Sequence, residues 1–291
     1  MDQFPKIPLE RQIVSLLSRN REDSFATQRK RGYVLGATAR ALHERFGLQK
    51  FDKLKAKHVA FLVERWKEAD TGHRSIDQNL THLRWLVHKI GKDILVPRTN
   101  AELGIESGPR HTRAGKTVSE SRFAEIIGAV AEPRLRAALL LARHLGLRFE
   151  EAMLFRPGRD FDGQRVWVKR GTKGGRPRYL FPYNERQREA LKVARDLVTG
   201  DAGLIPRECP TYEKWRQQCY PQLRAAGMSR ASGVVFHDLR RTYASERMDY
   251  LVRERKMPQE RAAQLVAREL GHGRTEVLQW YIADRGEQSV A

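Results

Sequence analysis

The sequence predicts a mainly helical protein of two domains, with one small β-hairpin in the second. Three observations support this fold class. The chain has 291 residues, a length typical of two ordinary domains. Apolar residues recur at three- and four-residue spacing through most of it, as in amphipathic helices. The alternation that predicts strands is confined to two short segments, residues 164–171 and 178–182.

The first domain is predicted to be helical throughout. Helices are expected around Ile13, Leu16 and Leu17 and over residues 25–46, 59–66 and 76–90. Short breaks containing Gly or Asp separate them. Four or five helices in about a hundred residues suggest a compact helical module.

A linker is expected where the helical pattern stops. Residues 91–117 lose periodicity and carry Gly, Pro and basic residues. We therefore expect a first domain at 1–108, a linker at 109–117 and a second domain at 118–291.

The second domain is predicted to combine buried helices with the hairpin. Ser119 begins a possible capping box, and an apolar run follows it to Val130. A buried helix is expected from Leu135 to Leu145, with a break at Gly146. A Gly- and Pro-rich turn at 172–177 joins the two strands. The chain is expected to be helical again from Thr211, with helices over 239–251, 258–270 and 276–282.

The charge balance points to a polyanionic partner. The formal net charge is +20, and both predicted domains are basic. No apolar run approaches the roughly 18 residues of a membrane span, and the N-terminus has no signal-peptide pattern. Cys209 and Cys219 are expected to be reduced thiols. These features predict a folded, cytosolic protein that binds polyanions.

The sequence gives no sign of nucleotide hydrolysis. Gly115, Lys116 and Thr117 resemble the end of a phosphate-binding loop, but Arg110 stands where that loop needs its first glycine. No carboxylate cluster suggests a catalytic metal. We therefore expect no cofactor and no metal.

Four local patterns carry residues suited to chemistry. Arg148 follows the helix break at Gly146 and precedes Glu151, Lys173 lies in the hairpin turn, His237 and Arg240 share a helix face, and His272 precedes Tyr281 by nine residues. Each residue alone has an ordinary structural explanation. Such explanations do not account for the order and spacing of the whole set.

This set resembles the active site of the tyrosine recombinases, the phage integrase family. That family carries an arginine in a G-L-R-x-x-E-A box, a lysine on a β-hairpin, H-x-L-R, L-G-H, and a tyrosine nine residues after that histidine. Every element has a counterpart between residues 118 and 285. The helical first module is similar to the core-binding domain of such enzymes. The resemblance implies a two-domain clamp around DNA.

The resemblance assigns the groups that would hold the reacting phosphate. Arg148 and Arg240 would bind its non-bridging oxygens bidentately, and His272 would add a hydrogen bond. Glu151 is expected to orient Arg148 or His237.

The resemblance also assigns the nucleophile and the proton-transfer groups. Tyr281 would attack the phosphodiester, forming a 3′-phosphotyrosyl link. His237 would act as general base and Lys173 as general acid. Lys169, on the same hairpin, is an alternative to Lys173. Three further basic residues of the hairpin are expected to hold phosphates: Arg170, Arg176 and Arg178.

The implied activity is site-specific recombination of duplex DNA by a homotetramer on paired sites, with possible accessory DNA-bending or directionality proteins. Integration or excision of a mobile element is the expected role, in the cytoplasm and on the nucleoid, with a bacterial or phage origin. Alternatives are Xer-like dimer resolution, DNA inversion, a type IB-like topoisomerase and a non-catalytic DNA-binding protein.

One departure from the family pattern concerns spacing. Arg240 and His272 are further apart than expected, and the excess falls around residues 250–260. An extended helix or a loop is expected there.

Overall fold

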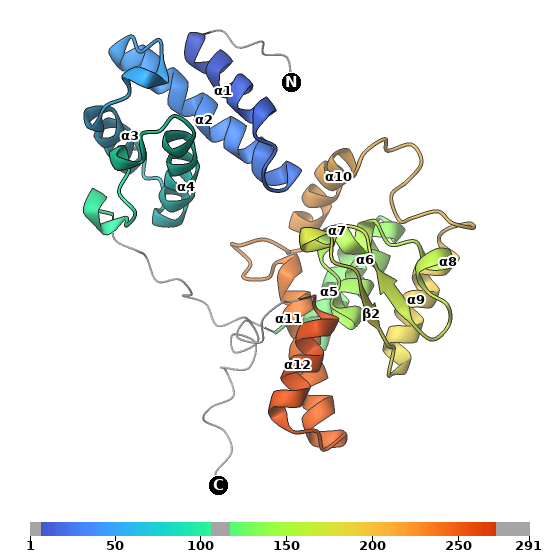
Figure 1. Cartoon of the computed structure of the whole chain (residues 1–291). Coiled ribbons are helices and arrows are strands. Elements are labelled where there is room, and N and C mark those ends of the chain that lie inside the picture. Colours follow the sequence, from blue (N-terminus) through green and yellow to red (C-terminus); the bar gives the residue numbers. More distant parts are fainter. Residues whose placement is uncertain (1–6, 106–116, 272–291) are drawn as a thin grey trace. The chain divides into compact units, whose positions relative to one another are not determined.

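The computed structural model describes residues 7–105 and 117–271 and forms two compact units, Met1–Thr112 and Arg113–Ala291 (Figure 1). The predicted fold class, mainly helical with two domains and a small hairpin, is confirmed. The domain bounds at 108 and 118 stay a prediction, because residues 106–116 lie outside the described part. Within the described residues, no helix is both long and apolar enough to cross a membrane.

Unit 1 is a bundle of helices around an apolar core. Its helices are α1 (Pro8–Arg19), α2 (Phe25–Phe46), α3 (Ala56–Glu68) and α4 (His73–Lys89), with 3-10 turns at Phe51–Lys53, Asp93–Leu95 and Ala101–Leu103. The long helix predicted over 25–46 is confirmed. Its first turn is capped by Ser24, whose hydroxyl accepts a hydrogen bond from the Thr27 backbone N–H. Leu35, Leu80 and Leu83 are among the fully buried core residues.

Unit 2 combines helices with the hairpin. The helices are α5 (Glu120–Ala129), α6 (Pro133–Leu145), α7 (Phe149–Met153), α8 (Pro157–Asp160), α9 (Glu185–Asp196), α10 (Tyr212–Ala225), α11 (Phe236–Asp249) and α12 (Gln259–Glu269). The strands are β1 (Val166–Val168) and β2 (Arg178–Leu180). Cys209 and Cys219 are free thiols.

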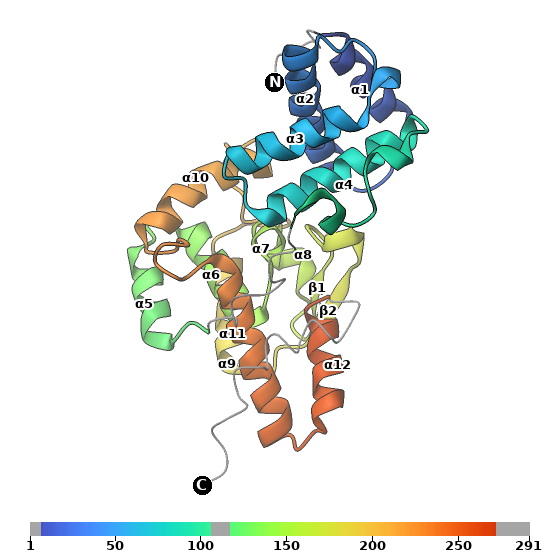
Figure 2. The ribbon, with the colours of Figure 1, turned by 90° about the vertical axis from the view of Figure 1, so that its left-hand side faces the viewer.

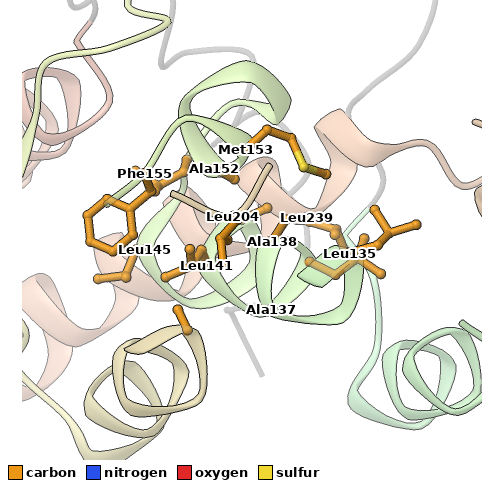
Figure 3. Close-up of a cluster of buried hydrophobic side chains, with 14 of the residues drawn as sticks. Leu135, Ala137, Ala138, Leu141, Leu145, Ala152, Met153, Phe155, Leu204 and Leu239 are labelled. Atoms are coloured by element: carbon orange, nitrogen blue, oxygen red, sulfur yellow. The ribbon is translucent and has the colours of Figure 1, made fainter. Parts of the chain in front are cut away.

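Helix α6 is the centre of the unit 2 core. It packs against α7, α9 and α11, and its Leu and Ala side chains are buried beside Met153, Phe155 and Leu239 (Figure 3). The break predicted at Gly146 is confirmed, since this residue ends α6 with φ of 65°. A Cβ there would lie 2.4 Å from Cδ1 of Tyr243, so only glycine fits.

The hairpin is antiparallel and shorter than predicted. Val166 pairs with Leu180 and Val168 with Arg178, and these side chains point into the protein. Trp167 and Tyr179 lie on the outer face, where their rings stack with centroids 5.7 Å apart. The strands stop early because the connecting segment contains glycines with positive φ and a proline, which cannot donate to the ladder.

Helices α11 and α12 form a helical hairpin (Figure 2). Helix α11 continues into a π-helical turn, Tyr250–Glu254, and the chain then reverses at Lys256, which has φ of 51°. Buried apolar residues such as Met248, Leu251 and Val266 hold the two arms together. The excess residues predicted around 250–260 thus form an extended helix followed by a tight turn.

Candidate active site

Arg148 is held at the start of α7 by the glutamate three residues later. It is the N-cap residue of that helix and has extended backbone angles. The Glu151 carboxylate accepts a hydrogen bond from the Arg148 backbone N–H at 2.8 Å and another from Arg148 Nη1 at 2.6 Å. The G-L-R-x-x-E sequence therefore produces both the helix start and the orientation of its arginine.

Glu151 is the centre of a cluster of three arginines. Its side chain is fully buried, and Arg178 donates to both carboxylate oxygens at 2.7 Å. Arg240 Nη1 lies 3.7 Å from Oε2. Burial alone would raise the pKa of Glu151, but the hydrogen bonds from Arg178 and the positive charges of the three guanidinium groups lower this pKa to about 2. The carboxylate is therefore ionised at every physiological pH.

Arg240 links two segments that are distant in the sequence. It lies on the first turns of α11, is fully buried, and donates hydrogen bonds to the backbone carbonyls of Gly146 and Leu270. Gly146 is the C-cap residue of α6, and Leu270 is the C-cap residue of α12. The contact therefore connects the segment that contains Arg148 with the end of α12, immediately before Gly271.

His237 lies one turn before Arg240 on α11 and is exposed. Partial desolvation of its ring lowers its pKa to about 4, and nearby guanidinium groups, first that of Arg240, add to the shift. The imidazole is therefore neutral near pH 7, with one ring nitrogen unprotonated.

Lys173 begins a 3-10 turn, Lys173–Gly175, between the two strands. The segment leading to it packs on α7: at Gly171 a Cβ would lie 2.9 Å from the backbone N of Glu151. The alternative residue, Lys169, is 3.2 Å from Asp160 and lies over the Trp167 ring. Its ammonium is therefore already engaged.

The prediction that Arg178 holds a phosphate is wrong. Its side chain is only 7% exposed and is bound to Glu151. Arg170 is bound to Asp160 at 2.7 Å, whereas Arg176 is exposed. A signal for Arg178 existed in the sequence, because an arginine at an inward position of a strand requires a buried counter-charge.

The structure brings Arg148, Glu151 and Arg240 together and places His237 one turn away on α11. The predicted orientation of Arg148 by Glu151 matches the hydrogen bonds. His272 and Tyr281 lie outside the described residues. Among residues 7–105 and 117–271, no group of His, Cys, Asp and Glu is arranged to hold a metal ion.

Two family models match the chain, one after the other. The phage integrase N-terminal model matches residues 8–96, and the integrase model matches residues 107–246. The chain belongs to the phage integrase family. This integrase is therefore a DNA strand-breaking and rejoining enzyme of the tyrosine recombinase type. A search of curated proteins found no match to its sequence.

Solved integrase structures share the fold of this integrase at low sequence identity. A lambda integrase fragment, crystallised as a dimer bound to a COC′ core site, has a TM-score of 0.65 and 17% identity, covering 97% of this chain and 96% of that chain. The Tn1549 transposon integrase, in complex with circular intermediate DNA, has a TM-score of 0.61 and 14% identity, covering 95% of both chains. A lambda integrase tetramer bound to a Holliday junction has a TM-score of 0.65 and 16% identity, covering 96% of this chain and 77% of that chain.

Proposed function

We propose that this integrase catalyses site-specific integration or excision of a mobile element, by cutting and rejoining duplex DNA through a 3′-phosphotyrosyl intermediate. The observation that carries this proposal is the buried Glu151, which holds Arg148 at 2.6 Å and lies 3.7 Å from Arg240. One anionic residue thus organises two cations that come from helices α7 and α11.

The two guanidinium groups suit the charge of the transition state. A pentacovalent phosphorane gains negative charge on its non-bridging oxygens, and guanidinium forks match such oxygens in geometry. In this proposal Arg148 and Arg240 bind those oxygens, Arg240 through the Nη hydrogens that the carbonyls of Gly146 and Leu270 do not use, and His272 adds a hydrogen bond. Loss of one such donor commonly lowers the rate by about 10²- to 10³-fold.

Proton transfer and nucleophilic attack fall to three further side chains. Tyr281 attacks the phosphorus and forms the 3′-phosphotyrosyl bond while the 5′ oxygen leaves. His237, whose ring is neutral near pH 7, takes the phenolic proton in this proposal. Lys173, in the hairpin turn, protonates the leaving 5′ oxygen. The energy of the broken bond is kept in the phosphotyrosine, so religation needs no nucleotide.

The proposed assembly is four protomers on two paired duplex sites. The chain's net charge of +20 favours extended contact with DNA phosphates. The match in fold to an integrase tetramer on a Holliday junction supports four-fold assembly. Accessory DNA-bending or directionality proteins, and residence on the nucleoid, complete the proposal. The linker at 109–117 would join two domains that grip the duplex.

The test is covalent capture of DNA in EDTA. Wild-type protein, Tyr281→Phe and Tyr33→Phe are incubated with fragmented DNA from the source genome, denatured with SDS, and the attached DNA is sequenced. Tyr33 is an exposed residue of α2 and serves as the matched control. We expect attachment by wild type and Tyr33→Phe at a few discrete inverted-repeat sites. Tyr281→Phe should attach no DNA while retaining near wild-type affinity, because one hydroxyl contributes little beside many phosphate contacts.

Each other outcome has a distinct meaning. Attachment by Tyr281→Phe would refute the choice of nucleophile. Attachment scattered over the genome would favour a topoisomerase. Absence of attachment by wild type, at sites that it binds, would favour a non-catalytic DNA-binding protein.

A further inference from the structure

Arg178 is a buried cation to which the catalytic scheme above gives no role. It lies on β2 opposite Val168, with its side chain 7% exposed. Its neighbours on the inward face of the hairpin, Val166 and Leu180, are apolar. An apolar residue at position 178 would continue this pattern. A charged residue is costly to bury there unless it is fully paired.

Each nitrogen of the Arg178 guanidinium donates a hydrogen bond. Nη1 and Nη2 donate to the two carboxylate oxygens of Glu151 at 2.7 Å, and Nε donates to the backbone carbonyl of Glu269 at 2.6 Å. This geometry uses the planar fork of arginine, and a lysine ammonium cannot reproduce it. Arg178 is therefore committed to protein partners rather than to DNA.

The partners of Arg178 belong to segments that carry the proposed catalytic groups. Glu151 orients Arg148 and contacts Arg240. Glu269 is the last residue of α12, and the next carbonyl, that of Leu270, is held by Arg240. Two arginines thus bind consecutive carbonyls at the end of one helix.

The approach of Arg178 to this helix end is close. Gly271 has φ of 63°, and a Cβ there would lie 3.2 Å from Cδ and 3.3 Å from Nη1 of Arg178. The residue that follows Gly271 is His272. Through its bonds to Glu269 and Glu151, Arg178 therefore holds the end of α12 against α7. Arg148 is the N-cap residue of α7.

We propose that Arg178 is a positioning residue, which holds Glu151 and the end of α12 in register so that Arg148 and Arg240 meet the reacting phosphate correctly. This inference rests on the proposed recombinase chemistry. Arg178 touches no DNA and transfers no proton. Its removal leaves the Glu151 carboxylate without its bidentate partner. The carboxylate that orients Arg148 and lies beside Arg240 is then no longer held in one position.

The test separates the rate of cleavage from DNA affinity. Arg178→Lys keeps the charge but loses the fork, and Arg178→Met loses both. Arg165→Gln is the control, since Arg165 lies just before β1, is 54% exposed and pairs only with Asp162 among the ion pairs of the described residues. The probe is a suicide duplex that contains a site recovered by covalent capture.

We expect single-turnover formation of the covalent complex, at saturating DNA, to fall about 10- to 100-fold in both Arg178 variants, because misplacement of catalytic groups by about 1 Å has effects of that size. The dissociation constant for DNA should stay within roughly threefold of wild type. Arg165→Gln should cleave at the wild-type rate. Rates are expressed per folded molecule, with the folded fraction taken from thermal unfolding, so that a loss of stability is not counted as a loss of rate.

Two results would overturn the inference. One is a wild-type rate per folded molecule in Arg178→Lys. The other is a loss of affinity as large as the loss of rate, which would make Arg178 a DNA contact. Both require an active wild-type protein in the same assay, whereas an inactive wild type would refute the proposed function instead.

A second substrate identifies the groups through which Arg178 acts. A sulfur in place of the bridging 5′ oxygen leaves as a thiolate and needs no general acid. We expect the Arg178 variants to remain slow on this substrate, because the defect concerns the arginines. Restoration of the wild-type rate would place the effect on leaving-group protonation and overturn the assignment.

Discussion

The two units bury very different side chains. Among the residues of unit 1 that the structure describes, the buried ionisable ones are Arg31, His58 and His82, in a core otherwise made mainly of leucine, valine and isoleucine. In the described part of unit 2 the buried charged residues are Arg143, Glu151, Asp160, Arg178, Asp238, Arg240, Arg247 and Glu269. Both units are helical, so the contrast does not arise from the fold class.

The difference in buried charge implies that the two interiors are stabilised in different ways. Burial of an ion pair usually gives little net stability compared with apolar packing, while removal of one partner is strongly destabilising. Unit 1 relies mainly on apolar packing. In unit 2 the buried charges are paired with one another or with nearby charged side chains, and Glu151 is the counter-charge of Arg148 and Arg240. The comparison predicts different consequences for mutations in the two interiors.

The largest effect is expected for Glu151→Gln. The change is nearly isosteric but leaves Arg178 and Arg240 buried without their counter-charge. We expect a loss of about 3–5 kcal/mol in the free energy of unfolding, measured with urea. Covalent capture should slow by about 10²-fold as Arg148 loses its orientation. Glu150→Gln, at the exposed neighbouring position, is the control, and an equal effect there would contradict the role of the buried cluster.

An intermediate effect is expected for Leu83→Ala in unit 1. Leu83 lies on α4 and is 1% exposed, so truncation leaves a cavity and should cost about 2–5 kcal/mol of unfolding free energy. DNA affinity should fall with the loss of folded unit 1. The cleavage rate at saturating DNA should stay at the wild-type level, since the residues proposed to be catalytic belong to unit 2. Val14→Ala, at a side chain that is 55% exposed, serves as the control. Slow cleavage by Leu83→Ala at saturating DNA would contradict the expectation that unit 1 does not affect the cleavage step.

The smallest effect is expected for a matched pair of helix caps. Ser24 caps α2 of unit 1 and Ser119 caps α5 of unit 2, each through a hydrogen bond to a backbone N–H three residues later. Replacement of either serine by alanine should cost about 1 kcal/mol, measured by chemical unfolding. Neither change should slow cleavage. A slower Ser119→Ala would mean that the charged interior of unit 2 responds to strain at a distant helix end.

Much of the fold follows from periodicity. The helix at 25–46 and the break at Gly146 were readable because apolar spacing and a glycine stop mark them clearly. Helix α9 was not predicted, since only a few small or apolar residues, such as Ala190, Leu191 and Ala194, face the core from a strongly polar sequence. Tertiary packing, rather than local pattern, forms that helix.

The site was only partly readable. The spacing of Arg148 and Glu151 predicts their contact, because a helix places residues three apart on one face. The role of Arg178 depends on its distance to Glu269, 91 residues further along the chain, and local patterns carry no such information. The position of Arg178 in the strand alternation indicates that its side chain points inward, but it does not identify Glu151 as the carboxylate that pairs with it.

The hydrogen bonds from Arg240 to the carbonyls of Gly146 and Leu270 join segments that leave the ribosome at different times. A nascent chain that has left the ribosome only as far as α11 contains Arg240, Arg148 and Glu151, but not the end of α12 that completes their arrangement. Both hydrogen bonds of Arg240 to these carbonyls therefore form only when translation has passed residue 270. An unfinished polypeptide that ends at α11 therefore lacks the carbonyl of Leu270, one of the two that hold the Arg240 guanidinium.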